Sequence, residues 1–111
     1  MFALVIVLNQ TDYLEDVLSK FVHLGVGATI LDSQGMAAAI VHGGIQSIPM
    51  FGSLKTMLSG SNPFNKTIFT VLKDEATLQS VKDAVMGTLK KVGPSTGFMF
   101  TLPVKDIVSL G

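Results

Sequence analysis

The chain has 111 residues, enough for one compact domain built around one hydrophobic core. It contains no cysteine, which excludes disulfide bonds and thiolate metal sites, and its eight lysines balance eight acidic residues, so the basic surface that nucleic acids require is missing. Only 14% of the residues are charged and 48% are hydrophobic, a composition that predicts a homo-oligomer whose subunits cover part of each other's surface.

The apolar stretches do not have the features of targeting or membrane-spanning segments. The run FALVIVL at 2–8 has no basic residues before it and no small-residue cleavage site after it. Residues 33–54 carry no charge and are long enough to cross a bilayer, but several glycines and Pro49 interrupt them. We therefore expect a cytoplasmic protein that does not span a membrane.

The first part of the chain predicts a strand, a helix and a second strand. Residues 2–8 are apolar and rich in β-branched side chains, which is typical of a strand buried on both faces. Asp12 is expected to cap the following helix, with Glu15 completing a capping box, and Gly25 is expected to end it. GATILD at 27–32 then indicates the second strand. The helix carries one apolar stripe, formed by Leu14, Val17, Leu18, Phe21 and Leu24.

A long connection at 33–65 follows, and Lys55 is its only charged residue. Loops longer than about 12–15 residues are usually functional or disordered, and an apolar composition argues against intrinsic disorder. MAAAIVHG and SLKTMLSG are each compatible with a short helix. Two interpretations stay open: the segment docks onto a partner, or it packs against its own oligomer. The residues proposed for partner contact are His42, Met50, Phe51 and Met57.

The second half repeats the order of the first. KTIFTVL at 66–72 indicates a strand, and 74–91 indicates a helix that Asp74 caps. GFMFTL at 97–102 indicates a fourth strand, which Pro103 ends. The remaining tail has three apolar residues that are expected to pack, namely Ile107, Val108 and Leu110.

Two strand–helix–strand units predict an α+β fold, the ferredoxin-like βαββαβ sandwich. In this fold a four-stranded antiparallel sheet carries both helices on one face. Both sets of alternating residues in the strand at 2–8 are apolar, so neither face of that strand is polar. We therefore expect the face without helices to be buried against another subunit.

The order of these elements, together with GVGATILDSQG and the ending GFMFTLPVKDIVSLG, resembles the PII-like signalling proteins of the nitrogen regulatory protein PII superfamily. The resemblance covers nearly the whole chain except 36–63 and treats 1–111 as a single domain. It implies a non-catalytic homotrimer that binds small effectors, mostly adenine nucleotides, in clefts between subunits. It also implies that the connection at 33–65 is a T-loop, which docks onto a partner such as a membrane transporter or an enzyme.

The resemblance assigns candidate ligand-binding residues. The glycine at the base of the T-loop corresponds to Gly35, the phosphate-wrapping B-loop falls at 93–97, and a strand lysine corresponds to Lys66. Phe98 stands where the family has a phosphate-binding lysine, and 108–110 replace two arginines, so a less charged ligand or none fits better than ATP bound in the family's usual way. The complete set is Gly35, Met36, Ala37, Lys66, Gly93, Ser95, Thr96, Gly97 and Phe98.

Two interpretations of the glycine turn at 93–97 are possible from its residues alone. A P-loop is excluded, because the turn lacks both the spacing and the lysine that neutralises phosphates. Its backbone amides and the hydroxyls of Ser95 and Thr96 can still form a cradle for a neutral or weakly anionic group. The alternative is a simple turn between a helix and a strand.

Other functions have weaker support. His42 with Met36, Met50 and Met57 suggests a site for a soft ion such as Cu(I), as in a metal-binding trimer similar to the CutA proteins. His23 is expected to interact with a helix end. No nucleophile stands beside a base, so we do not expect an enzyme. A purely structural subunit of a larger assembly is a further alternative.

Overall fold

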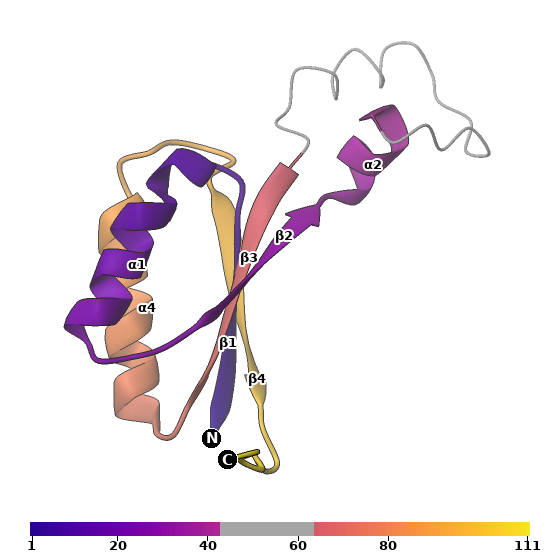
Figure 1. Ribbon diagram of the computed structural model, residues 1–111. Coiled ribbons are helices and arrows are strands. Elements are labelled where there is room, and N and C mark those ends of the chain that lie inside the picture. The colour runs from indigo at the N-terminus through magenta and orange to yellow at the C-terminus, as the bar shows by residue number, and fades with distance from the viewer. Residues whose placement is uncertain (43–63) are drawn as a thin grey trace.

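The computed structural model describes residues 1–42 and 64–111, and its strands and helices follow the expected order (Figure 1). The strand expected at 27–32 lies two residues later, and the strand expected at 66–72 begins two residues earlier. The elements are β1 (Phe2–Leu8), the 3-10 turn η1 (Thr11–Tyr13), α1 (Leu14–His23), β2 (Thr29–Gln34), α2 (Met36–His42), β3 (Phe64–Leu72), α4 (Glu75–Leu89) and β4 (Gly97–Pro103).

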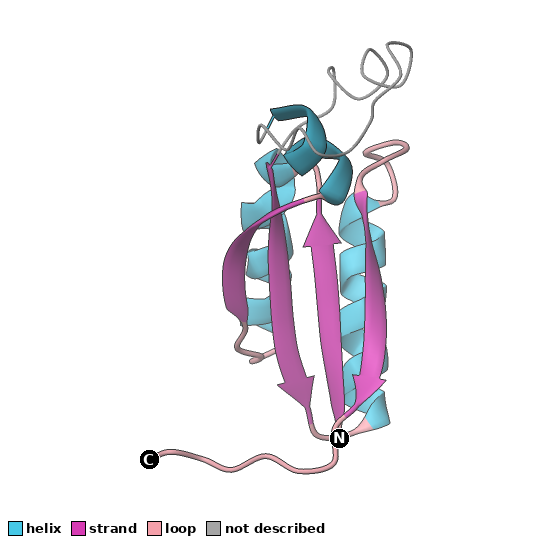
Figure 2. Cartoon of the chain, turned by 90° about the vertical axis from the view of Figure 1, so that its right-hand side faces the viewer, coloured by secondary structure: helices cyan, strands magenta, loops and turns pink. Residues whose placement is uncertain are grey.

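The four strands form one antiparallel sheet in the order β2-β3-β1-β4. Helices α1 and α4 lie side by side on one face of this sheet (Figures 1 and 2). The arrangement is compatible with the ferredoxin-like sandwich. Strand β1 is central, and both of its neighbours, β3 and β4, come from the second half of the chain.

The hydrophobic core lies between the two helices and the sheet. Leu4, Ile6 and Leu8 alternate along β1 and are buried, which places them on the face that the helices cover. The apolar stripe expected on the first helix is largely confirmed, since Val17 and Phe21 are buried, although Leu24 is exposed. The core cluster consists of Leu4, Ile6, Val17, Phe21, Ile68, Leu72, Leu78, Val81 and Val85.

The two expected helix caps have different outcomes. Asp12 does not cap α1, because it lies within the 3-10 turn at 11–13 and the helix begins at Leu14 without a side-chain cap. Asp74 does cap α4: its carboxylate accepts a hydrogen bond of 2.7 Å from the backbone N–H of Thr77. The backbone and side-chain hydrogen bonds from Thr77 hold the pKa of Asp74 below its usual value.

The face of the sheet without helices is apolar, as the composition of β1 indicates. We call it the open sheet face. Cross-strand neighbours on it pair aromatic with β-branched side chains, such as Val5 with Phe69 and Phe100, and Val7 with Phe98. Its exposed apolar side chains are Leu31, Phe69, Val71, Phe98, Phe100 and Leu102.

The tail at 104–111 does not pack as expected. The Val104 N–H donates a hydrogen bond to the carbonyl of Met1, the residue before β1. Beyond that point it extends away from the sheet (Figure 2), and Ile107, Val108 and Leu110 are 62%, 76% and 100% exposed. The strand pairing ends at Pro103, which leaves the tail no neighbouring strand within the described chain.

No helix in the part of the chain that the structure describes is suited to cross a membrane. The longest described helix, α4, has 15 residues, and none of the described helices combines the length and the apolar character that a bilayer requires.

Candidate functional site

Most of the predicted ligand-binding residues gather at one end of the sheet. β1 and β2 end there, while β3 and β4 begin there, so Gly35, Lys66 and the turn at 93–97 share this end (Figure 1). We call it the connection end. Gly35 follows β2 and the turn precedes β4, and these are the two outer strands. With neighbouring strands about 4.8 Å apart, about 14 Å separates them across β3 and β1. One chain therefore does not bring Gly35 and the turn into direct contact.

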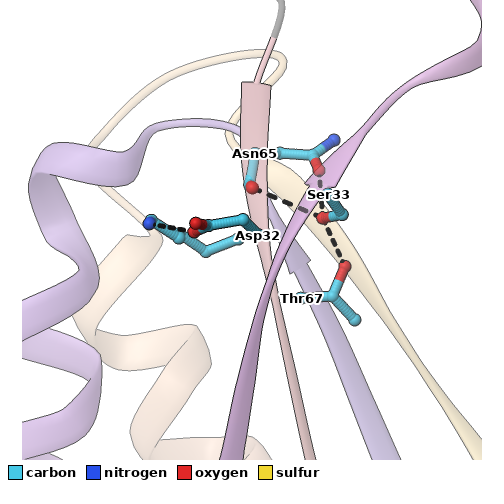
Figure 3. Close-up of polar contacts among 5 residues, drawn as sticks. Asp32, Ser33, Asn65 and Thr67 are labelled. Atoms are coloured by element: carbon cyan, nitrogen blue, oxygen red, sulfur yellow. Dashed lines mark hydrogen bonds and ion pairs between the residues drawn. The ribbon is translucent and has the colours of Figure 1, made fainter.

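A chain of side-chain hydrogen bonds crosses part of this distance. The Ser33 hydroxyl donates to the side-chain oxygen of Asn65 and lies 2.7 Å from Thr67 Oγ1 (Figure 3). Asn65 Nδ2 in turn donates to Asn9 Oδ1 over 3.3 Å. These contacts link the end of β2, the beginning of β3 and the end of β1.

Asn9 extends the same chain to the glycine turn. Its side-chain Nδ2 donates to the Ser95 carbonyl over 3.4 Å, and its backbone N–H donates to the Thr96 carbonyl over 2.8 Å. We call the four residues Ser33, Asn65, Asn9 and Ser95 the polar bridge. It connects both ends of the long connection with the glycine turn. Sequence reasoning missed Asn9 and Asn65. The sequence signal for them was an amide side chain directly after the apolar strand β1 and another near the start of β3.

The conformation of the glycine turn has a local explanation. Gly93 and Ser95 have φ angles of 109° and 62°, and the Thr96 hydroxyl donates to the Gly93 carbonyl over 2.5 Å. Gly97 has a φ of 150°, and a Cβ at this position would lie 2.1 Å from the Val7 carbonyl oxygen. The glycines are thus required by the turn and by its close approach to β1, and the Thr96 hydroxyl already uses its proton within the turn.

Lys66 forms an ion pair with Asp32, its cross-strand neighbour in β2. By strand alternation both lie on the helix-covered side of the sheet. Figure 3 shows Asp32 pointing to the opposite side of the strands from Ser33 and Thr67. Asp32 was not among the predicted residues, because its importance follows from the register of the strands.

Lys66 and Asp32 line a cavity of about 380 Å³ at the connection end, which we call the Lys66 cavity. The other described residues in its lining are Thr11, Phe64 and Asn65. Phe64 is 61% exposed, which leaves an aromatic surface for stacking, and the paired charges of Lys66 and Asp32 offer one cation and one acceptor. The cavity therefore suits an aromatic ring with several hydrogen-bonding groups better than a polyphosphate.

The other predicted residues lie apart from this cavity. Phe98 is on the open sheet face, where its ring stacks on Phe100 at a centroid distance of 6.2 Å. Met36 is exposed at the start of α2, and Ala37 follows it in the same helix. Met36 is not among the residues that line the Lys66 cavity.

The predicted partner-binding and metal-binding residues lie largely beyond the described residues. His42 is the last residue of α2, whereas Met50, Phe51 and Met57 fall between 43 and 63, outside the described ranges. Within 1–42 and 64–111 no three histidine or acidic side chains gather in a way that could hold a metal ion. The CutA-like alternative therefore gains no specific support.

Comparisons with known proteins do not assign a family. No family model matches the chain, and no curated protein matches it either. The resemblance to the PII-like proteins remains an interpretation of the sequence.

Proposed function

We propose that this chain is a non-catalytic, cytoplasmic regulatory protein of the PII-like type. It binds a small effector at the connection end of the sheet and acts on a partner through residues 36–63. The observation that carries the proposal is the polar bridge, which joins Ser33 and Asn65, on either side of the connection, to the glycine turn. An effector that changes this end of the sheet thereby changes the two points from which the connection emerges.

The proposed effector is an adenine nucleoside or nucleotide of low charge. Phe64 supplies a stacking surface for the base, and Lys66 supplies the one cation among the described residues that line the cavity. Asp32 accepts hydrogen bonds from ribose hydroxyls or an exocyclic amine, but it repels additional phosphates. We therefore expect adenosine and AMP to bind at least as tightly as ATP, unlike at a site built for phosphates.

The proposed assembly is a homotrimer in which the open sheet faces pack around a central axis. The exposed apolar side chains on this face support burial against another copy. In such an assembly the connection ends of the subunits lie near one another, and the clefts between subunits complete the effector site.

The proposed action on the partner is a population shift. The effector favours one conformation of the connection, and the partner binds that conformation better than the others. The apolar composition of 36–63 is compatible with a protein partner, including a membrane transporter.

Calorimetric titration of the purified oligomer with adenosine, AMP, ADP, ATP and cyclic nucleotides tests the effector site. Phe64→Ala is expected to weaken binding about tenfold, because stacking on an aromatic side chain contributes about 1–3 kcal/mol per base. Lys66→Gln is expected to weaken the binding of AMP more than that of adenosine. Lys73→Gln, which removes a lysine just beyond the far end of β3, is the matched control and is expected to leave the affinities for AMP and adenosine unchanged.

Two results would contradict the proposal in different ways. If none of the adenine compounds binds, the effector is not an adenine nucleoside or nucleotide. Binding that is unchanged in both Phe64→Ala and Lys66→Gln would show that the effector lies elsewhere than in the Lys66 cavity.

A further inference from the structure

A second cavity, of about 220 Å³, lies between α4 and β4 on the helix-covered side of the sheet. Its walls are mostly apolar. Ile6, Val85 and Leu89 form its inner part, together with Met99 from β4. Met86 also lines it and is 58% exposed, and Phe98 borders it from β4, although alternation along β4 places the Phe98 side chain on the open sheet face. No described residue fills the space beside Ile6, Val85, Met86, Leu89 and Met99, so these side chains lack the dispersion contacts that a packed neighbour provides.

Among the described residues, Lys90, which follows α4, is the only one with an ionisable side chain in the lining of this cavity. Lys90 is exposed, and it makes no ion pair with any carboxylate of residues 1–42 or 64–111. The Thr96 hydroxyl, also in the lining, donates its proton to the Gly93 carbonyl. The cavity thus combines an apolar interior with one cation, a distribution that is complementary to an apolar chain ending in an anion.

We infer that this cavity binds a medium-chain carboxylate such as octanoate, with its carboxylate near Lys90 and its chain between α4 and β4. A water molecule occupies about 30 Å³ in the liquid, and a methylene group is of similar size, so 220 Å³ corresponds to about seven such groups. An eight-carbon acid therefore matches the available volume.

This site does not depend on the proposed nucleotide site. No described residue lines both cavities: one is formed mainly by α4, β4 and the turn between them, with Ile6 of β1, and the other by residues of β2, β3 and the turn before α1. The chemistry also differs, since Thr96 supplies the only hydroxyl among the described side chains that line the α4–β4 cavity, and none of these side chains carries an amide or a carboxylate. Loss of either site leaves the argument for the other unchanged.

The test uses the full-length protein with its methionine methyl groups labelled with ¹³C. Met86 and Met99 line the cavity, whereas Met1 and Met36 do not, so the methyl spectrum reports where a ligand binds. Titration with octanoate is expected to shift the Met86 and Met99 signals in a saturable way and to leave Met36 unchanged. Each methylene contributes about 0.8 kcal/mol when buried, so octanoate should bind about tenfold more tightly than hexanoate.

Charge controls complete the experiment. Lys90→Gln is expected to weaken octanoate binding about threefold, while Lys91→Gln, the adjacent lysine that does not line the cavity, is expected to leave it unchanged. Met86→Asp places a carboxylate at the exposed part of the wall and is expected to abolish binding. Octylamine has the same chain with the opposite charge and should bind more weakly than octanoate. The inference is overturned if octanoate causes no saturable shift, if Met36 shifts together with Met86, or if octylamine binds as well as octanoate.

Discussion

Gly97 lies where the first residue of β4 approaches β1, and its missing side chain has a clear physical reason. A methyl group there would sit 2.1 Å from the Val7 carbonyl oxygen, on a backbone whose φ of 150° already disfavours other residues. We expect Gly97→Ala to destabilise the fold by about 2–3 kcal/mol, because the backbone of the central strand must move.

The matched control for this prediction is Gly87, an exposed glycine in α4 with open space around its Cα. Gly87→Ala is expected to raise the free energy of unfolding by about 0.5–1 kcal/mol, since alanine is the better helix former. Chemical denaturation of both variants gives the comparison. A Gly97→Ala protein as stable as the parent would show that β1 and β4 do not approach as closely as described.

At the scale of single residues, the sequence predicts interactions that act locally. Asp74 and Thr77 are three residues apart, the spacing at which an N-cap side chain reaches a backbone N–H of the first turn. Asp12 had the same spacing to Glu15, but a 3-10 turn takes up 11–13 and moves the start of α1 to Leu14. The spacing to Glu15 therefore does not by itself determine where α1 begins.

At the scale of the elements, the polar bridge couples three strands and one turn. Ser33 and Asn9 both form hydrogen bonds with Asn65. We expect the stability effects of Ser33→Ala and Asn9→Ala to be non-additive by about 0.5 kcal/mol or more in a double-mutant cycle, because either change leaves Asn65 with one partner fewer. Thermal and denaturant unfolding of the two single variants and the double variant measure this coupling.

Gln10→Ala is the control for the Asn9 substitution, because it leaves the backbone bond from residue 10 to the Thr96 carbonyl in place. The change in the free energy of unfolding caused by Gln10→Ala is expected to be additive with that caused by Ser33→Ala. Additivity of Ser33→Ala and Asn9→Ala within about 0.3 kcal/mol would contradict coupling through the bridge.

Sequence reasoning predicted the elements well but not the bridge. Apolar runs and helical spacing located all four strands and the helices α1, α2 and α4, with shifts of about two residues at the ends of β2 and β3. The bridge depends on strand register, which places Ser33 opposite Asn65 although 32 residues separate them. The Lys66–Asp32 ion pair also depends on the register between β2 and β3. Sequence spacing does not identify such pairs, because their residues become neighbours only when the strands pair.

At the scale of the whole molecule, the open sheet face is the feature that most affects behaviour in solution. We expect Phe100→Lys to reduce the mass of the oligomer measured by light scattering, because a lysine at the centre of this face must lose its hydration when two copies pack. The matched control is Val22→Lys, an exposed apolar position on α1, which is expected to leave the mass unchanged. A parent protein that is already monomeric, or a Phe100→Lys protein of unchanged mass, would contradict the proposed assembly.

The central position of β1 affects how the protein folds during translation. Residues 2–8 are synthesised well before their hydrogen-bonding partners at 64–72 and 97–103. During translation this apolar strand has two unpaired edges, and the sheet can close only after β4 has emerged. We therefore expect newly made β1 to be prone to aggregation, and slowing translation beyond β2 should increase that aggregation.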